Sequence, residues 1–467
     1  MQMYEDEDFE ELPLAKFESM LKTNKILFFD SEEFEGIIIH YLDEGKVSLA
    51  KKALKLALEQ HPHSTGLKLV QVEILVYGSK FEMAEKMLNE LQSIEPTNEE
   101  IYIQRANIYS RKNQHEKAVD ELNTALQYTD DLADVYSLIG MEYLYLDNLE
   151  QAKNSFIKCL EADDDDEDHS ALFNIVYCFD FLDQNQQAIV FLKNYIDKNP
   201  YSEVAWHQLG REYFIEKEYP LAIEAFDYAT LIDERFIGAF MEKAKCLEKL
   251  GKYKKAIKNY MITLELEDPT PFALLRIGKC YEKLGKKALA IEYILKATNE
   301  DPLLQKGWLA IIKFYIKEND LEKALYYTNK ATGIDQENAK YWMMYARINQ
   351  SLQLYEESII GYNRALDNGE YRLKSWLSLA DLLTQMGEYQ TALEAIEKCS
   401  EFYPEKASVE YRLSGLNYLL KNTAKSLEHL KSALALKFKK HTLLQNLYPA
   451  VWETKTIQDT ISEYRID

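Results

Sequence analysis

Length, composition and charge narrow the classes of protein to which this chain can belong. Its 467 residues are 47% hydrophobic and 12% aromatic, which excludes a disordered chain, and only 16 Gly and 10 Pro favour long, rarely interrupted helices. The net charge of −23 falls almost wholly on residues 1–168, which hold 37 acidic and 16 basic side chains. General binding to nucleic acids or anionic membranes needs excess Lys and Arg, so the charge argues against both.

The N-terminal sequence and the cysteines predict the compartment. The start, MQMYEDEDFEELP, lacks the basic and apolar regions of a secretion signal, and no apolar run approaches the roughly 18 residues of a membrane span. The five cysteines form no CxxC pair, so they predict neither a disulfide framework nor a zinc site. We therefore expect a soluble, cytoplasmic protein.

The first 30 residues divide into an acidic segment and a capping helix. Residues 1–12 are strongly acidic, and we expect them to be mobile. In residues 13–30, Leu14, Phe17 and Leu21 form an apolar stripe at helical spacing. This stripe predicts an N-terminal helix that covers the helix expected to begin near residue 31.

From residue 31 onward the chain repeats with a period of 34 residues, apart from one step of 36. One position, which we call the anchor, holds Ala in ten repeats and Ser in two. The anchors are Ala50, Ala84, Ala118, Ala152, Ala188, Ala222, Ala256, Ala290, Ala324, Ser358, Ala392 and Ser426. Larger apolar residues follow four positions later and small ones seven positions later, which is one face of a helix. A small side chain in every repeat predicts close helix packing at that point.

A second apolar seam precedes each anchor. It starts with a large aromatic such as Trp206 or Trp308 and continues with Leu or Ile and then a small residue, at the i, i+3, i+4, i+7 spacing of another helix. Five residues before the anchor, nine of the twelve repeats have Gly, Asn, Asp or Ser, which tolerate the left-handed conformation that ends a helix. Each unit is therefore a predicted helical hairpin that must stack on its neighbours to bury both faces.

The pattern W-x-x-L-G-x-x-Y, followed by the anchor Ala and a Pro after the second helix, resembles the tetratricopeptide repeat. The fullest copy contains Trp206, Leu209, Gly210, Tyr213, Ala222, Phe226 and Ala229. The resemblance covers about residues 31–440 and implies an all-α solenoid, a right-handed superhelix of about twelve helical hairpins with terminal capping helices. For function it implies only a class, because such repeats mostly scaffold proteins and bind peptides in a concave groove.

The longer step of 36 residues contains an acidic loop, residues 163–168. We interpret it as a solvated, self-repelling loop, although an ion or a basic partner is an alternative, because it lacks the spaced ligands of an EF-hand. It divides the array into four acidic units, residues 31–168, and eight nearly neutral units, residues 169–440, and is a candidate hinge. Residues 441–467 predict C-terminal capping helices.

No sequence motif for catalysis is present. The chain has no P-loop, GxGxxG, HExxH or GxSxG, and the repeats leave no stretch for a catalytic domain. Four of the five tryptophans lie in one packing column, and all five cysteines occupy packing columns, so both are interpreted as structural. The eight histidines form no ligand pair at helical spacing. We predict no enzyme activity, no catalytic residues, no metal and no cofactor.

One pattern remains, in the column eleven residues before the anchor. Five successive repeats place a cation there, and we call this set the basic ladder: Arg211, Lys245, Lys279, Lys313 and Arg347. Four residues earlier lies a mostly apolar row, predicted to form a single stripe with the ladder. The row consists of His207, Met241, Leu275, Leu309 and Met343. In tetratricopeptide repeats this flank of the first helix lines the concave groove.

Two interpretations of the ladder stay open. It is either a solvated flank with salt bridges to acids such as Glu248 and Glu282, or a groove for an acidic and apolar protein segment. The favoured hypothesis is a non-enzymatic scaffold or adaptor that binds a protein or peptide partner through these ten residues. The alternative is a binder of nucleic acid or phosphate ligands, which the net charge of −23 disfavours. Residues 1–12 have the acidic and apolar character of the expected ligand, so self-association through this segment is a further hypothesis.

Overall fold

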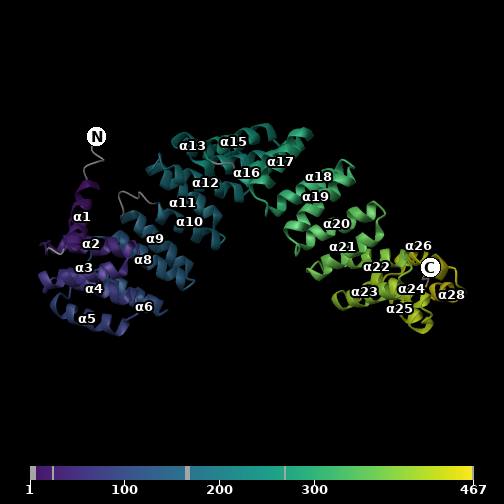
Figure 1. The fold of residues 1–467 in the computed structure, drawn as a ribbon, viewed down its shortest axis with the longest axis horizontal. Coiled ribbons are helices and arrows are strands. Elements are labelled where there is room, and N and C mark those ends of the chain that lie inside the picture. The colour runs from purple at the N-terminus through teal and green to yellow at the C-terminus, as the bar shows by residue number, and fades with distance from the viewer. Residues whose placement is uncertain (1–6, 24–25, 163–168, 268–269, 465–467) are drawn as a thin grey trace. The chain divides into compact units, whose positions relative to one another are not determined.

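The structure is a computed structural model that describes residues 7–23, 26–162, 169–267 and 270–464 of the chain. Every regular element among these residues is a helix, and successive helices pack as antiparallel pairs (Figure 1). The chain forms two compact units, Met1–Glu234 and Arg235–Asp467. The predicted all-α solenoid is confirmed.

The first unit contains α1 and six helical hairpins. Its helices are α1 (Glu7–Thr23), α2 (Ser31–Asp43), α3 (Val47–Gln60), α4 (Thr65–Tyr77), α5 (Phe81–Ile94), α6 (Glu99–Arg111), α7 (His115–Ala125), α8 (Leu132–Tyr145), α9 (Leu149–Ala162), α10 (Ser170–Phe181), α11 (Asn185–Lys198), α12 (Glu203–Ile215) and α13 (Tyr219–Ile232). Even-numbered helices are the first helices of the hairpins, and odd-numbered ones from α3 onward are the second helices.

The second unit contains six more hairpins and a C-terminal group of short helices. Its helices are α14 (Ile237–Lys249), α15 (Tyr253–Leu266), α16 (Pro271–Lys283), α17 (Lys287–Glu300), α18 (Gln305–Lys317), α19 (Leu321–Ile334), α20 (Ala339–Ser351), α21 (Tyr355–Asp367), α22 (Leu373–Gln385), α23 (Tyr389–Phe402), α24 (Ala407–Leu419), α25 (Thr423–Lys437), the 3₁₀ helix η1 (Phe438–Lys440), α26 (Thr442–Leu447), α27 (Pro449–Trp452) and α28 (Lys455–Glu463). Together the two units hold the twelve predicted hairpins.

The anchor column is the tightest packing position in both units. All twelve anchors are 0% exposed. The hydroxyl groups of both serines are hydrogen-bonded: Ser358 Oγ donates to Ala346 O and Ser426 Oγ donates to Ser414 O, each at 2.8 Å. Buried polar groups are normally hydrogen-bonded, so Ser can replace Ala here without leaving an unpaired hydroxyl group in the core.

Glycines on the first helix make room for the second helix. A Cβ added at Gly140 would lie 2.6 Å from the ring of Phe156, and one at Gly210 would lie 2.5 Å from the ring of Phe226. Both rings are fully buried. The small residues predicted in the first helix are therefore required by aromatic rings that follow the anchors.

The turn inside every hairpin has one residue with a positive φ, five residues before the anchor. These residues are Gly45, Ser79, Asn113, Asp147, Asp183, Lys217, Gly251, Gly285, Asn319, Gln353, Gly387 and Lys421, with φ between 55° and 83°. The predicted left-handed position is thus present in all twelve hairpins. Three of them have Lys or Gln there, for which the left-handed conformation costs about 1–2 kcal/mol of conformational free energy.

In three of the four repeats that have tryptophan in this column, the indole ties the first helix to the turn that precedes it, whereas Trp376 Nε1 is buried without a hydrogen-bond partner among the described residues. The indole Nε1 donates to the carbonyl six residues earlier, from Trp206 to Pro200 O (3.0 Å) and from Trp308 to Pro302 O (2.8 Å). Trp308 is 7% exposed, whereas Trp206 is half-buried. The predicted packing role is confirmed, with the indole N–H adding a specific hydrogen bond.

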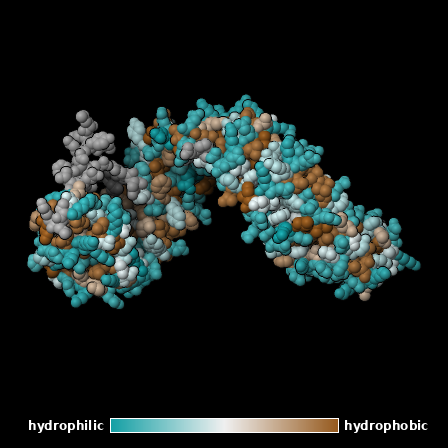
Figure 2. All heavy atoms as spheres, viewed as in Figure 1, coloured by the Kyte–Doolittle hydropathy of each residue, from teal (hydrophilic) through white to brown (hydrophobic). Residues whose placement is uncertain are grey.

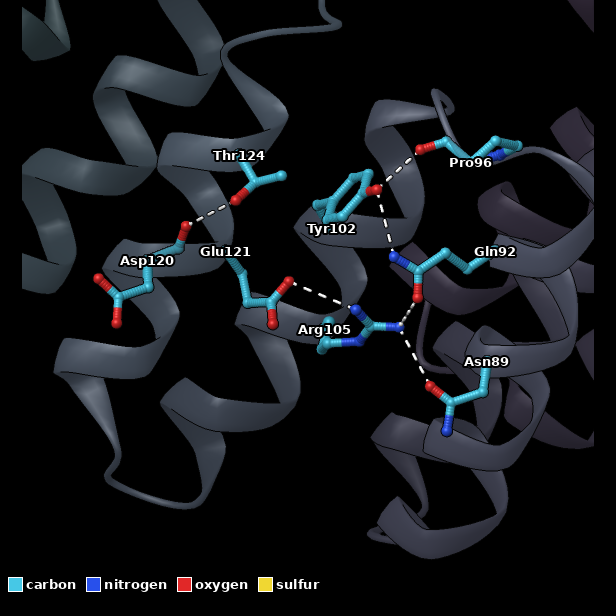
Figure 3. Close-up of polar contacts among 8 residues, drawn as sticks. All are labelled: Asn89, Gln92, Pro96, Tyr102, Arg105, Asp120, Glu121 and Thr124. Carbon is cyan, nitrogen blue, oxygen red and sulfur yellow. Dashed lines mark hydrogen bonds and ion pairs between the residues drawn. The ribbon is translucent and has the colours of Figure 1, made fainter.

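A polar network replaces apolar packing in the third hairpin (Figure 3). Arg105 on α6 takes a position that is Leu or Ile in most repeats. Its guanidinium donates to Asn89 Oδ1 (3.2 Å) and Gln92 Oε1 (3.0 Å) on α5 and pairs with Glu121 Oε2 (3.5 Å) on α7. Arg105 therefore joins three helices through one side chain.

The ends of the chain are covered as predicted, with boundaries that differ. Phe17 of α1 is 0% exposed and contacts Phe29 and Phe34 edge-on. The helix begins at Glu7, six residues before the predicted start at 13, while residues 1–6 and the acidic loop 163–168 lie outside the described residues. At the other end, Pro449 is the first residue of α27, where its missing N–H costs no helical hydrogen bond.

Candidate partner-binding surface

The basic ladder lies on five successive first helices. Arg211 is on α12 of the first unit, and Lys245, Lys279, Lys313 and Arg347 are on α14, α16, α18 and α20 of the second unit. Each cation lies in the C-terminal half of its helix, and each hairpin contributes one cation. The second unit therefore carries four of the five predicted cations on one set of helices.

Two ladder cations have partners within their own unit. Arg211 Nη1 donates to Gln208 Oε1 (2.8 Å), and its Nη2 lies 3.9 Å from Asp180 Oδ2. Lys245 Nζ pairs with Glu242 Oε1 (2.6 Å) and lies 5.3 Å from the ring of Phe272. These two positive charges are largely satisfied internally.

The other three ladder cations have no carboxylate partner. Lys279, Lys313 and Arg347 form no ion pair with any residue that the structure describes. The acids expected to neutralise the ladder are engaged elsewhere, with Glu248 bound to Arg276 and Glu282 bound to Lys317. That part of the solvated-flank interpretation is wrong, because each acid meets a closer cation.

Glu248 is held firmly by its neighbours. Both of its oxygens accept from Arg276, Oε1 from Nε (2.8 Å) and Oε2 from Nη2 (2.7 Å), and Oε1 also accepts from Tyr260 Oη (2.7 Å). A bidentate pair of this kind fixes geometry as well as charge. It braces α14, α15 and α16, and the charge of Glu248 raises the pKa of Lys279 by less than burial, Arg276 and Lys306 lower it.

The surroundings of Lys279 are positive and partly dehydrated. Burial lowers the pKa of Lys279, and the nearby cations Arg276, Lys306 and Lys313 lower it further. A depressed lysine pKa means that the protonated form lacks compensation. This is the electrostatic character of a site that gains from an incoming anion.

Sequence reasoning missed part of this surface. Seven residues before the ladder column lie Phe272 on α16, Lys306 on α18 and Lys340 on α20, all exposed. Positions seven apart share one helix face, so the spacing i−7 from each ladder residue was the available signal. We call Lys279, Lys313, Arg347, Lys306 and Lys340 the cationic face.

The predicted apolar row differs from the structure in its exposure. Leu275 and Met343 are each only 2% exposed, and His207, Met241 and Leu309 are half-buried. The row faces the neighbouring helices more than the cationic face does. Leu275 and Met343 therefore pack beneath the surface. Phe272, at 40% exposed, is an apolar group beside the cations. In the view of Figure 2, hydrophobic surface is divided into separate patches by hydrophilic residues.

Comparison with known proteins assigns the repeats. The tetratricopeptide repeat family matches residues 99–131, 133–166, 273–302 and 373–406, and each stretch covers one hairpin, such as α6 with α7 or α16 with α17. These four stretches of the chain are tetratricopeptide repeats. The match over residues 273–302 includes Lys279, so one residue of the cationic face lies inside a recognised tetratricopeptide repeat.

Relatives of this chain resemble it over limited lengths or at low identity. Anaphase-promoting complex subunit 3 of Schizosaccharomyces pombe is 26% identical over 171 residues, which make up 37% of this chain and 25% of that protein. The crystal structure of the APC/C hetero-tetramer Cut9-Hcn1 is 14% identical with a TM-score of 0.32, covering 99% of this chain and 97% of that one. Yeast Tom70 is also 14% identical, with a TM-score of 0.36 and coverage of 91% and 99%.

The remaining chemistry of the described tetratricopeptide repeats is structural. All five cysteines are buried, and burial raises the pKa of Cys178 to about 11, which disfavours a reactive thiolate. No three His, Cys, Asp or Glu side chains of the described residues converge as metal ligands. None of the helices in that part of the chain is long and apolar enough to cross a membrane.

Proposed function

We propose that this protein is a non-enzymatic adaptor whose second unit binds an acidic, partly apolar segment of a protein partner on the cationic face. The observation that carries the proposal is that Lys279, Lys313 and Arg347 lack carboxylate partners among the described residues. The repeat architecture supports a binding role, because each hairpin adds one copy of the same surface position.

Affinity and specificity come from different groups in this proposal. Ion pairs at an exposed rim contribute about 0–1 kcal/mol each, so the cations mainly accelerate association and set the register of the ligand. The partly dehydrated ammonium of Lys279 gains more, because burial and its positive neighbours lower its pKa and a carboxylate relieves both effects. Apolar contacts with Phe272 supply further affinity.

The test is a selection from a random peptide display library on the full chain. We expect enrichment of peptides that interleave Asp or Glu with apolar residues. The combined variant Lys279→Glu, Lys313→Glu and Arg347→Glu should lose these peptides. A matched control changes three exposed lysines of second helices, Lys254, Lys258 and Lys398, to Glu and keeps binding, although its net charge changes equally.

The selection also distinguishes the alternative function. The same unpaired cations suit nucleic-acid phosphates, for which affinity falls steeply as salt rises. Binding of single-stranded RNA with that salt dependence, and no enrichment of acidic peptides, would replace the adaptor proposal. Equal binding by the two triple variants would contradict any role for the cationic face.

The acidic N-terminal segment is a candidate ligand within the same protein. Residues 1–6 lie outside the described residues, so its docking stays a hypothesis. A peptide with the sequence of residues 1–12 should bind a chain that lacks them, and deletion should free the cationic face for other ligands. Unchanged partner affinity and oligomeric state after deletion would rule out docking in cis and in trans. Cytoplasmic localisation likewise stays a prediction.

A further inference from the structure

The first helices of the first unit carry acids at surface columns where the second unit carries cations. Glu73 on α4 occupies the column of the basic ladder. Glu100 on α6 and Asp134 on α8 lie seven residues before that column, the position of Lys306 and Lys340 in the second unit. On α4, α6 and α8 these positions therefore carry the opposite charge to their equivalents on α18 and α20. Asp43, the last residue of α2, raises the pKa of Glu73, and we call Asp43, Glu73, Glu100 and Asp134 the acidic face.

The acidic face is not neutralised within the described residues. No ion pair there reaches Asp43, Glu73 or Asp134, and Glu100 Oε1 only accepts a hydrogen bond of 2.8 Å from Gln104 Nε2. Burial raises the pKa of Glu73, and Asp43 adds to the rise. Burial also raises the pKa of Glu100, and the charges of Glu73 and Asp134 raise it further, although the hydrogen bond from Gln104 lowers it. These carboxylates repel one another and lack counter-charge.

A buried amide beside Glu100 provides an independent sign of a missing ligand. Gln104 is 9% exposed, and its Oε1 has no hydrogen-bond partner among the described residues, although its Nε2 is bound to Glu100. A buried carbonyl oxygen without a donor costs about 1–3 kcal/mol. Lys and Arg offer only donors. Among the described residues, Gln104 Oε1 lacks a donor and the Glu100 carboxylate has only Gln104 Nε2.

Aromatic rings on the same helices suit the same class of ligand. Tyr77 at the end of α4 is 55% exposed, and Tyr145 at the end of α8 is 61% exposed. Met141, one turn before Tyr145 on α8, is 36% exposed. Ring faces attract ammonium and guanidinium groups. Arg111 at the end of α6 is directed to Asn107 Oδ1 by its Nε (3.2 Å) and does not pair with the acidic face.

We infer that the first-helix face of α4, α6 and α8 binds a Lys- or Arg-rich segment of a partner polypeptide. The carboxylates lie on separate hairpins, and no three acids, Cys or His of the described residues converge on a metal. Helices α4 and α6 pack on each other, and packed helices lie about 8–10 Å apart, which is about three residues of extended chain. A cation at every third residue therefore fits this pair. This surface shares no residue with the cationic face, so it is tested independently.

The experiment measures binding of a labelled peptide of four Lys-Gly-Gly repeats to the full chain by fluorescence anisotropy. The test variant combines Glu73→Gln, Glu100→Gln and Asp134→Asn. The control variant combines Glu82→Gln, Glu90→Gln and Asp120→Asn, which changes the net charge equally at exposed positions on second helices. We expect at least a tenfold loss of affinity for the test variant and less than a twofold loss for the control.

Tyr145→Ala provides a second variant that leaves the buried core intact. We expect it to weaken the peptide about threefold, because one cation–π contact is lost. A block peptide of four Lys followed by eight Gly should bind more weakly than the spaced peptide. Equal losses for the test and control variants would show attraction by net charge alone and overturn the inference. Spermine that competes as well as the spaced peptide would show recognition of small cations and overturn it too.

Discussion

A buried carboxyl group, Glu212, makes the stability of the first unit depend on pH. Glu212 on α12 is 0% exposed, and its Oε2 accepts from Asn185 Nδ2 (3.1 Å). Its Oε1 and the Oδ1 of Asp180 are both buried and have no donor among the described residues. Burial, which is the largest cause, and then Asp180 raise the pKa of Glu212 to about 7, although Asn185 and Arg211 oppose the rise. Glu212 therefore holds its proton to near neutral pH.

The sign of the effect follows from proton linkage. An unfolded Glu loses its proton near pH 4.5, whereas native Glu212 holds its proton to about pH 7. The stabilisation is complete below pH 4.5 and is lost as the pH rises to about 7. At about 1.4 kcal/mol per pKa unit, the loss is on the order of 3 kcal/mol.

The substitution Glu212→Gln removes the titrating carboxyl group and keeps the size of the side chain. Its stability advantage over the natural chain should grow by up to about 1.4 kcal/mol per pH unit between pH 4.5 and 7, and then level off. The assay is urea denaturation at pH 5 to 8, with hydrogen exchange of α10 to α12. Glu142→Gln is the control, because Glu142 occupies the same column but is bound to His115 Nδ1 (2.7 Å). A difference for Glu212→Gln that does not change with pH would refute the reasoning.

Three further substitutions test the packing, each by urea denaturation. Arg105→Ala should destabilise the first unit by about 2–3 kcal/mol, since Glu121, at 22% exposed, loses its cation; no loss would contradict the network in Figure 3. Lys421→Gly should stabilise the second unit by about 0.5–1 kcal/mol, because φ is 65° there, and a loss would show that strain is absent. Gly140→Ala should cost about 1–3 kcal/mol, because its Cβ meets the ring of Phe156; a neutral change would mean that the ring moves freely.

The repeat framework was predictable because its buried columns tolerate few residue types. An anchor that must be small appears as Ala or Ser in every repeat, and a turn that needs positive φ appears mostly as Gly, Asn, Asp or Ser. The exceptions, such as Lys217, were placed correctly because the period, rather than the residue type, fixed the turn. Periodic constraints average over twelve copies, so a single unusual residue does not obscure them.

The candidate sites were less predictable because charge pairing is not periodic. The sequence offered Glu248 as a partner for the ladder, but Arg276, on the first helix of the next hairpin, forms that pair instead. The spacing of the apolar row was correct, but Leu275 and Met343 are buried and not at the surface. Sequence spacing does not show which side of a helix faces the neighbouring helices, and for these two residues it is the side on which they lie. The boundary between the compact units, at Glu234 and Arg235, has no marked signal in the sequence.

The ladder column differs from the anchor column in the residue types that it holds. The anchor column is uniform because packing constrains it, whereas the ladder column runs from Ile39 and Glu73 to Arg347 and Asp381. A solvated column under no constraint would mix charges, yet five cations follow one another. Their series ends where Asp381 is bound by Arg412 through two hydrogen bonds of 2.6 Å, an internal pair that needs no ligand. Like charges on successive first helices repel one another, and only Arg211 and Lys245 of the five have a carboxylate partner among the described residues, so the proposed anionic segment would offset the repulsion at the other three.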